Sequence, residues 1–248
     1  MKKYVNLFVF VFMIGACLSQ GRAQTKSAVS YKNPVVDIAM PDPTVIKAAD
    51  GYFYVYATES TRNVPIMKSK DLVEWTYCNT AFTNKTRPRF EPKAGIWAPD
   101  INYINGKYVL YYAMSVWGGE QTCGIGVATA DSPQGPFTDH GKMFRSNEIG
   151  VQNSIDPSLL QYEGRNYLVW GSFRGIYVIE LTADGLSIMS GAKKKRIAGT
   201  AFEAVYIHKH GDYYYMFASI GSCCQGVKST YKVVVGRSKK VWGPYKDK

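Results

Sequence analysis

The stretch "DPTVIKAADGYFYVYAT", residues 42–58, decides the fold, because its layout returns three times further along the chain. Two β-prone runs flank a turn at Gly51, and such a pair of runs predicts a β-hairpin. Each later copy also begins with an acid, contains a glycine turn and ends in an aromatic-rich run. The copies are "DINYINGKYVLYYAMS" (100–115), "DPSLLQYEGRNYLVWGS" (156–172) and "EAVYIHKHGDYYYMFAS" (203–219).

Two further strand-like runs follow each hairpin and complete a repeating unit, and the opening acids are 58, 56 and 47 residues apart. Four strands per unit at a period of about 50 residues indicate an all-β protein of the β-propeller class. Helix should be scarce, because no segment keeps an apolar period of about 3.6 residues. A β-sandwich is the alternative, but it does not explain why an acid opens every unit. The further runs are 64–69 and 74–78, 124–130 and 135–139, 175–181 and 185–190, and 232–238 and 243–247.

The four opening acids are candidates for a shared site. The first strand of each propeller blade lines the central channel, so Asp42, Asp100, Asp156 and Glu203 should face a common pocket. Crowded carboxylates have pKa values that are pushed apart, so one can stay protonated while another is ionised. Glycoside hydrolysis uses such an acid and base pair. A single Asp-Pro pair is more often a turn, but the set of four favours a site.

Asp100 has a second interpretation. It ends the motif "WAPD", residues 97–100, which could serve mainly as structure while Trp97 forms a wall on which a sugar stacks.

The N-terminus has the layout of a secretory signal peptide. Lys2 and Lys3 precede an apolar run from Val5 to Ala16, which is too short to span a bilayer. Cleavage after Ala23 would make residues 1–23 the signal peptide of an exported protein, periplasmic or extracellular. The alternative is lipidation at Cys17, in the lipoprotein-like motif "IGAC". No later segment is apolar for long enough to cross a membrane, so we expect no transmembrane span.

Charge and cysteine content restrict the classes of partner. The net charge is +11, but "KKKR", residues 193–196, is the only basic block, and we interpret it as a solvated loop, with no nucleic-acid partner. Cysteines outside the signal region show no C-x-x-C pair, so neither a disulfide scaffold nor a zinc site is predicted. The adjacent Cys223 and Cys224 could form a disulfide or remain two thiols. His208 and His210 are placed in an exposed turn, not in a metal site.

The motifs as a set resemble glycoside hydrolase family 43. "DPTVI", "WAPDI", "NSIDPSLL", "GSF" and "FEAVYI" occur in the family's order, and residues 222–248, "SCCQGVKSTYKVVVGRSKKVWGPYKDK", resemble its endo-arabinanase branch. The resemblance covers nearly everything from Asn33 to Lys248. It implies a five-bladed β-propeller glycosidase domain, residues 31–248, that cleaves arabinofuranosides or xylosides with inversion and needs no cofactor for its chemistry.

The resemblance also implies roles for single residues. Asp42 matches the general base, Glu203 matches the general acid, and Asp156 matches a third carboxylate that modulates the pKa of the acid and keeps it oriented. Substrate contacts are expected at Trp97, Asp100, Gly118, Asn153, Ser172 and Phe173.

Only about four of the five blades are visible in the sequence, so we expect a domain that lacks its C-terminal blade. In the family, that blade supplies a His for a structural Ca²⁺ on the propeller axis, and we therefore expect no metal ligands in this chain. The expected activity is cleavage of α-L-arabinofuranosidic linkages in arabinan or a related plant polysaccharide, by a monomer. The alternatives are an exo-acting β-xylosidase or α-L-arabinofuranosidase of the same family, and a non-catalytic propeller fragment that binds an arabinose- or xylose-containing polymer.

Overall fold

Four antiparallel β-sheets dominate the computed structural model, which describes residues 30–246. All four belong to the unit formed by residues 33–248. The signal peptide expected at residues 1–23 and the lipidation site expected at Cys17 lie outside the described residues. Among residues 30–246, no helix has both the length and the apolar character needed to cross a membrane.

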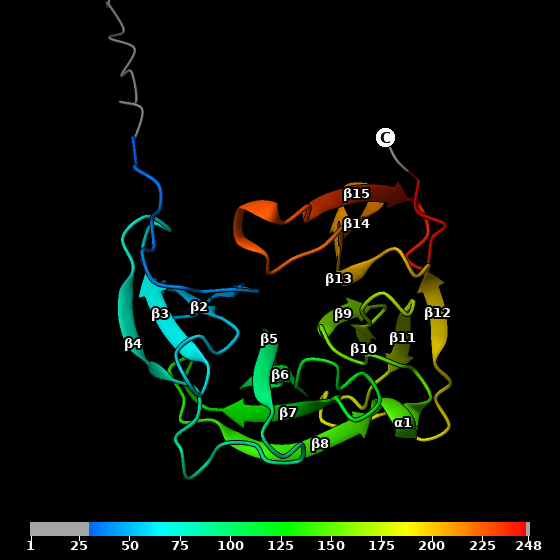
Figure 1. Cartoon of the computed structure of the whole chain (residues 1–248), viewed down its shortest axis with the longest axis horizontal. Coiled ribbons are helices and arrows are strands. Elements are labelled where there is room, and N and C mark those ends of the chain that lie inside the picture. The colour runs from blue at the N-terminus through cyan, green and yellow to red at the C-terminus, as the bar shows by residue number, and fades with distance from the viewer. Residues whose placement is uncertain (1–29, 247–248) are drawn as a thin grey trace, which may run out of the picture. The chain divides into compact units, whose positions relative to one another are not determined.

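Within each sheet the strands are neighbours in the order of the chain, as in the blades of a propeller. Figure 1 shows the sheets succeeding one another around a common centre. The β-propeller prediction is therefore confirmed, with four blades in the described residues. The strands are β1 (Thr44–Lys47), β2 (Phe53–Tyr56), β3 (Pro65–Ser69) and β4 (Thr76–Thr80); β5 (Gly95–Ile104), β6 (Lys107–Ser115), β7 (Gly124–Ala130) and β8 (Thr138–Arg145); β9 (Ser158–Tyr162), β10 (Arg165–Trp170), β11 (Ile176–Glu180) and β12 (Lys195–Ala198); β13 (Glu203–His210), β14 (Tyr213–Ile220) and β15 (Lys232–Ser238).

Helix is scarce in the described residues, as the sequence predicts. They contain one short α-helix, α1 (Ser146–Ile149), and one 3-10 turn, η1 (Gly226–Lys228).

The outermost strand of the third sheet differs from the prediction. It is β12, whose Arg196 pairs with Tyr177, and not the segment 185–190. Residues 182–188 instead close a turn of their own, in which Thr182 N–H donates to Ser187 O at 2.8 Å. Half of the basic block, which we expected to be a loop, is thus an exposed edge strand, and charged residues on an edge discourage unwanted strand pairing.

Three smaller differences concern strand ends. β8 begins at Thr138 and continues to Arg145, beyond the predicted segment 135–139. Of the segment 243–247, the described residues 243–246 contribute only an isolated bridge between Lys246 and Arg237, so the fourth sheet has three strands among the described residues. His208 and His210 are exposed residues of β13, and the turn begins after them.

The inner strands share a backbone feature at their start. It shows which residues of the four blades are equivalent, and these differ from the equivalent residues that the sequence predicts. Asp42, Ala98, Asp156 and Ala204 all have left-handed backbone, with φ of 50°, 36°, 56° and 52°. In β5 and β13 this residue lies at a β-bulge, where the pairing register shifts. The position that Asp42 and Asp156 occupy is therefore filled by Ala98 in the second blade, two residues before Asp100. In the fourth blade it is filled by Ala204, one residue after Glu203.

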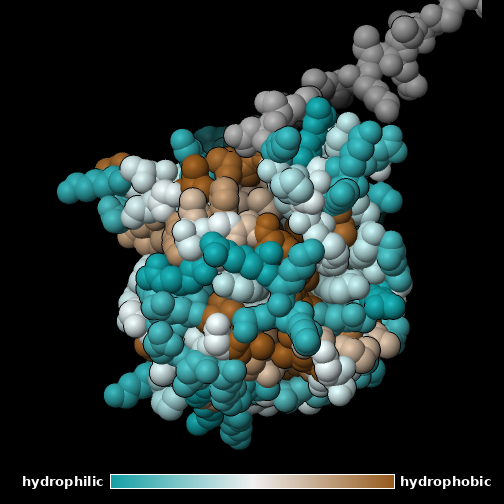
Figure 2. Space-filling view, turned by 90° about the vertical axis from the view of Figure 1, so that its right-hand side faces the viewer, coloured by the Kyte–Doolittle hydropathy of each residue, from teal (hydrophilic) through white to brown (hydrophobic). Residues whose placement is uncertain are grey.

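The apolar core lies between successive sheets. One cluster joins the first and second sheets around Tyr56 and Tyr112, a second joins the next pair around Tyr111 and Trp170, and a third joins the last pair around Ile207. On the face seen in Figure 2, hydrophilic side chains predominate, and hydrophobic ones show at the upper left and in gaps further down. The aromatic-rich runs of the sequence therefore pack the sheets face to face, which holds the starts of the inner strands around one site.

Candidate active site

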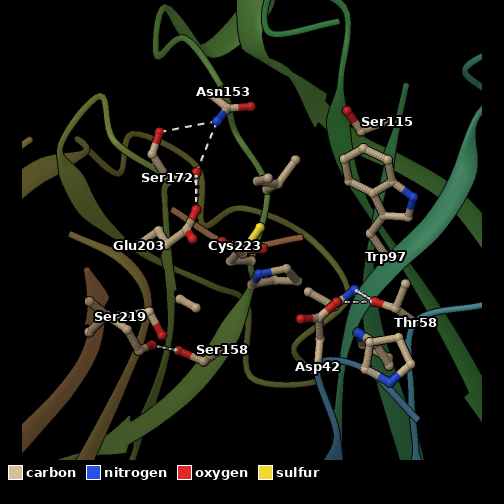
Figure 3. A pocket seen from close by; sticks show the side chains of 18 of the residues that line it. Asp42, Thr58, Trp97, Ser115, Asn153, Ser158, Ser172, Glu203, Ser219 and Cys223 are labelled. Carbon is tan, nitrogen blue, oxygen red and sulfur yellow. Dashed lines mark hydrogen bonds between the residues drawn. The ribbon is translucent and has the colours of Figure 1, made fainter. Parts of the chain in front are cut away.

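Three carboxylates from three different blades line one pocket of about 1280 Å³. Asp42 precedes β1, Asp156 precedes β9, and Glu203 begins β13. In Figure 3, Glu203 and Asp42 stand on two sides of this pocket. The fold thus brings together the three residues that the sequence predicts as catalytic, although they are far apart in the chain.

Asp42 is exposed to the pocket and is held by a short chain of hydrogen bonds. The Thr58 hydroxyl donates to Asp42 Oδ2 at 2.5 Å, and the Ala98 N–H donates to Thr58 Oγ1 at 2.6 Å. The left-handed backbone of Asp42 turns the chain sharply before β1, so the carboxylate leaves the strand and faces the pocket. An oriented, solvent-facing carboxylate is suited to accept a proton from water.

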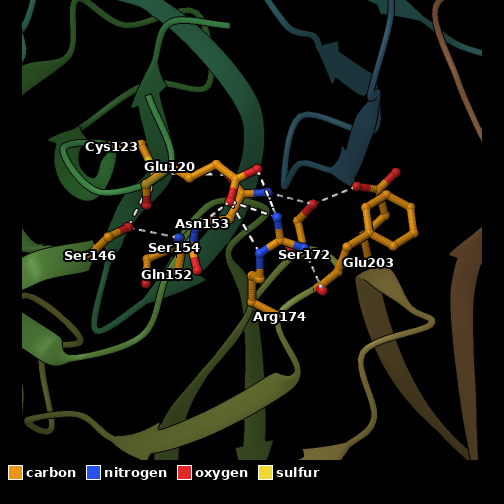
Figure 4. Close-up of polar contacts among 10 residues, drawn as sticks. Glu120, Cys123, Ser146, Gln152, Asn153, Ser154, Ser172, Arg174 and Glu203 are labelled. Carbon is orange, nitrogen blue, oxygen red and sulfur yellow. Dashed lines mark hydrogen bonds and ion pairs between the residues drawn. The ribbon is translucent and has the colours of Figure 1, made fainter. Parts of the chain in front are cut away.

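Glu203 is buried and has a hydroxyl donor of its own. The Ser172 hydroxyl donates to Glu203 Oε2 at 2.6 Å, and the Asn153 side-chain amide donates to Ser172 Oγ at 3.0 Å. Figure 4 shows this relay running from Asn153 to Glu203. Asn153 and Ser172 therefore orient the predicted acid, and the substrate contacts expected at both stay a prediction.

Tyr231 lines the same pocket as Glu203. Burial raises the pKa of Tyr231, and the neighbouring Glu203 raises it further. The phenol therefore stays protonated at neutral pH and offers the pocket a hydroxyl group. The sequence reasoning missed Tyr231, because only the fold brings it to Glu203.

Asp156 is buried, and its pKa is strongly perturbed. Burial raises the pKa of Asp156 well above its ordinary value, and the negative charges of Glu203 and Asp42 raise it further. The Ala204 backbone N–H acts in the opposite direction. The charges of Glu203 and Asp42 act on Asp156, so the three groups form one interacting cluster. Such a cluster can deliver one proton while another member takes one up.

Asp100 lies beside the same pocket but is buried among three blades. It accepts hydrogen bonds from Leu159 N–H at 2.7 Å and from the Asn102 side chain at 2.7 Å, with the Thr44 hydroxyl at 3.5 Å. Burial raises the pKa of Asp100 to about 6, although these hydrogen bonds lower it. With these donors in place, the geometry favours a role in joining the blades, and a substrate contact at Asp100 stays a prediction.

The raised pKa of Asp100 predicts a pH dependence of stability. Between about pH 4 and pH 6 the unfolded chain ionises this carboxyl group while the folded protein keeps it protonated, so stability is lost as the pH rises. The loss is about 3 kcal/mol relative to Asp100→Asn, whose neutral amide does not titrate. Urea unfolding of both proteins at pH 4, 5, 6 and 7 measures it. A difference between the two proteins that stays constant with pH would contradict the burial of a titrating Asp100.

The other predicted substrate contacts meet at the same pocket. Trp97 packs against Trp117 with ring centroids 5.6 Å apart, and Trp117 is 78% exposed. Gly118 has φ of 79° with open space where a Cβ would lie, and Phe173 lines the pocket as well. The wall expected at Trp97 is therefore a pair of indoles, and Trp117 was missed although it directly precedes Gly118.

A salt bridge holds the loop that carries Gly118. The Arg174 guanidinium donates to both Glu120 carboxylate oxygens, at 3.1 and 3.0 Å, and Gln152 donates to Glu120 at 2.6 Å. The Asn153 N–H donates to the Glu120 carbonyl at 2.7 Å. Figure 4 shows that this cluster adjoins the relay to Glu203. Neither Glu120 nor Arg174 was predicted, because their pairing joins two loops that are far apart in sequence.

Among residues 30–246, no group of three or more His, Cys, Asp and Glu side chains is arranged to hold a metal ion. The Ca²⁺ that the family resemblance implies stays a prediction.

Cys223 and Cys224, which the sequence left open, form a disulfide between neighbouring residues. Both line the pocket that holds the three carboxylates.

A propeller whose inner strands bring three carboxylates into one cleft is the arrangement expected of a glycosidase. The chain belongs to glycosyl hydrolases family 43, whose family model matches residues 31–248. It is 38% identical over 220 residues to extracellular endo-α-(1→5)-L-arabinanase 1 of Bacillus subtilis (strain 168), covering 84% of this chain and 67% of that protein. It is 35% identical over 235 residues to the extracellular exo-α-(1→5)-L-arabinofuranosidase ArbA of Cellvibrio japonicus (strain Ueda107), covering 84% of this chain and 66% of that protein.

The solved structures agree with this assignment. The α-L-arabinanase of Cellvibrio cellulosa superposes with a TM-score of 0.75 at 32% identity, covering 85% of this chain and 74% of that one. The chain thus spans about two thirds of the length of the two curated relatives and three quarters of this structural one.

Proposed function

We propose that the protein hydrolyses α-L-arabinofuranosidic linkages in arabinan or a related plant polysaccharide, with inversion at the anomeric carbon. The observation that carries the proposal is the meeting of Asp42, Asp156 and Glu203 in one pocket. The choice of substrate is supported by the two relatives, one named an endo-arabinanase and the other an exo-arabinofuranosidase.

In the proposed reaction, Asp42 takes a proton from a water molecule as the water oxygen bonds to the anomeric carbon. The bond from that carbon to the glycosidic oxygen breaks in the same step. Glu203 gives its proton to the departing oxygen, so both products leave neutral. Asp156 is the third carboxylate, and its interaction with the other two suits it to keep the proton within the cluster and Glu203 oriented. The indoles of Trp97 and Trp117 offer an apolar face to a sugar ring.

The substrate assignment is tested by product analysis. Incubation with debranched arabinan should yield arabino-oligosaccharides or arabinose, whereas xylo-oligosaccharides should remain intact. Release of xylose from xylo-oligosaccharides without attack on arabinan would overturn the arabinan assignment and favour the β-xylosidase alternative. Binding of arabinan without any cleavage would favour a sugar-binding propeller.

The hydroxyl of Ser172 should contribute to catalysis through Glu203. Ser172→Ala removes the donor at 2.6 Å and should lower kcat on arabinotriose roughly 10- to 100-fold, because hydrogen bonds to charged groups are strong. KM should change little if the hydroxyl positions the acid, and would rise in parallel if its main role were to bind sugar. Ser172→Thr, which keeps a hydroxyl, should recover part of the loss in kcat. Equal kcat for the wild type and Ser172→Ala would contradict the positioning role.

We also propose that the protein is exported, with residues 1–23 as a cleaved signal peptide. The basic start and the short apolar run support this, and both relatives are named extracellular. Mass spectrometry of the exported protein should find Gln24 at its N-terminus. A lipid-modified N-terminus at Cys17 would instead establish a lipoprotein.

A further inference from the structure

We propose that the Cys223–Cys224 disulfide is an apolar platform for the sugar residue on the leaving-group side of the cleaved bond. This inference rests on the proposed function, because it takes Glu203 as the acid that protonates the leaving oxygen. It assigns a binding role to a pair of residues that takes no part in the acid and base chemistry.

The disulfide is placed on the Glu203 side by the chain itself. It lies in the loop between β14 and β15, which begins one residue after Ile220. Ser219, near the end of β14, pairs directly with Glu203, and Tyr231, at the end of the loop, lines the same pocket as Glu203. Both ends of the loop therefore lie at the pocket that holds the predicted acid. In Figure 3, the side chain of Cys223 is seen between Glu203 and Trp97.

The loop around the disulfide is held by its own hydrogen bonds. Thr230 N–H donates to Ser222 O at 3.0 Å, and Ser222 N–H donates to the Thr230 hydroxyl at 3.1 Å. Gln225 donates from its backbone to Ser229 Oγ at 3.0 Å and from its side chain to Ser222 Oγ at 3.0 Å. The loop is exposed but closed on itself, so it can present a fixed surface to a ligand at little further entropic cost.

A platform of sulfur and carbon suits a sugar ring. A disulfide carries no N–H or O–H donor, and its polarisable sulfur atoms favour dispersion contacts. Ligand pockets combine such apolar walls with a few polar groups that fix orientation. Here Glu203 and Tyr231 are polar groups of the same pocket, and Trp97 with Trp117 forms an apolar wall on the second blade.

A purely structural role explains this disulfide poorly. The stability gained from a cross-link grows with the length of the loop that it closes, and Cys223 and Cys224 are separated by one position. Their bridge therefore restrains the unfolded chain very little. What it changes is the local surface, because it replaces two thiols by one ring in the wall of the cleft.

The test compares two substrates that share the same arabinofuranose but differ in their leaving groups. α-1,5-Linked arabinotriose leaves a sugar, whereas methyl α-L-arabinofuranoside leaves methanol, which has no ring. In the full chain, Cys223→Ser/Cys224→Ser should lower kcat/KM for arabinotriose roughly tenfold, the usual scale for lost apolar contacts in a site. The methyl glycoside should react at the wild-type rate. Cys78→Ser is the matched control, because Cys78 is a free thiol of β4 outside the pocket, and it should affect neither substrate.

Equal losses on both substrates, or no loss on either, would overturn the platform. If the serine variant does not fold, as judged by circular dichroism, Cys223→Ala/Cys224→Ala carries the same comparison. A wild-type chain that binds arabinotriose but cleaves neither substrate would refute the proposed function alone. In that case, calorimetry measures the affinity of both proteins for arabinotriose. The variant should bind roughly tenfold more weakly than the wild type, and unchanged binding would contradict the platform. A wild-type chain that neither binds nor cleaves arabinotriose would overturn both.

Discussion

Replacement of Glu203 by Gln should lower kcat on arabinotriose roughly 10²- to 10⁴-fold, the usual contribution of a general acid. The amide is close in size to the carboxyl group and can still accept from the Ser172 hydroxyl, so the local structure should persist. Affinity for arabinotriose should therefore change little, which calorimetry on the nearly inactive variant can measure.

The nature of the leaving group makes this prediction specific. 2,4-Dinitrophenolate departs without needing a proton, so a 2,4-dinitrophenyl α-L-arabinofuranoside should lose less than about tenfold in kcat with Glu203→Gln. Glu163→Gln, in an exposed turn between β9 and β10, is the matched control and should leave both substrates unaffected. Equal losses of Glu203→Gln on the two substrates would mean that Glu203 does not act as the acid.

Replacement of Asp42 by Asn should lower kcat by a similar factor, roughly 10²- to 10⁴-fold, but on both substrates alike. Activation of the attacking water is needed whatever group departs, so an easy leaving group offers no rescue. The Thr58 hydroxyl can still donate to the amide oxygen, which keeps the side chain in place. Steady-state kinetics on arabinotriose and on the dinitrophenyl glycoside provide the comparison.

Asp37→Asn is the control for Asp42, because Asp37 is an exposed acid five residues earlier that does not line the pocket. A variant of Asp42 that is rescued by the dinitrophenyl leaving group would behave as an acid and would reverse the two proposed roles. A variant with full activity would remove Asp42 from the mechanism.

The repeat made most of the fold predictable. Strand-like runs, glycine turns and an even period are local patterns, and they were enough to foresee the hairpins and the propeller. β7 and β15 have the predicted boundaries. The edge strand β12 was not foreseen, because the pairing of Arg196 with Tyr177 depends on a partner strand and not on the basic sequence itself.

The sequence predicted which acids lie at the site, but not which positions of the four blades are equivalent. Aligning every unit on its acid placed Asp100 in the same position as Asp42. The bulge at Ala98 shifts that register, and Asp100 becomes a buried link among three blades. A bulge adds one residue to one strand and leaves no clear mark in the hydrophobic pattern.

The contacts that orient the acids could not be read from the sequence. Thr58 reaches Asp42 across 16 positions, and Ser172 reaches Glu203 across 31. The first contact depends on the register of the β1–β2 hairpin, and the second depends on how two neighbouring blades pack. The resemblance marked Ser172 as a site residue, but its partner became known only from the structure.

The most direct test of the proposed mechanism is the configuration of the first product. Proton NMR during hydrolysis of α-1,5-linked arabinotriose by the full chain follows the two anomers of the new reducing end before they interconvert. Attack of an Asp42-activated water with departure assisted by Glu203 inverts the α-linkage, so the β-anomer should appear first and the α-anomer should follow by mutarotation. Initial release of the α-anomer would require a covalent intermediate and would contradict the proposed roles of Asp42 and Glu203.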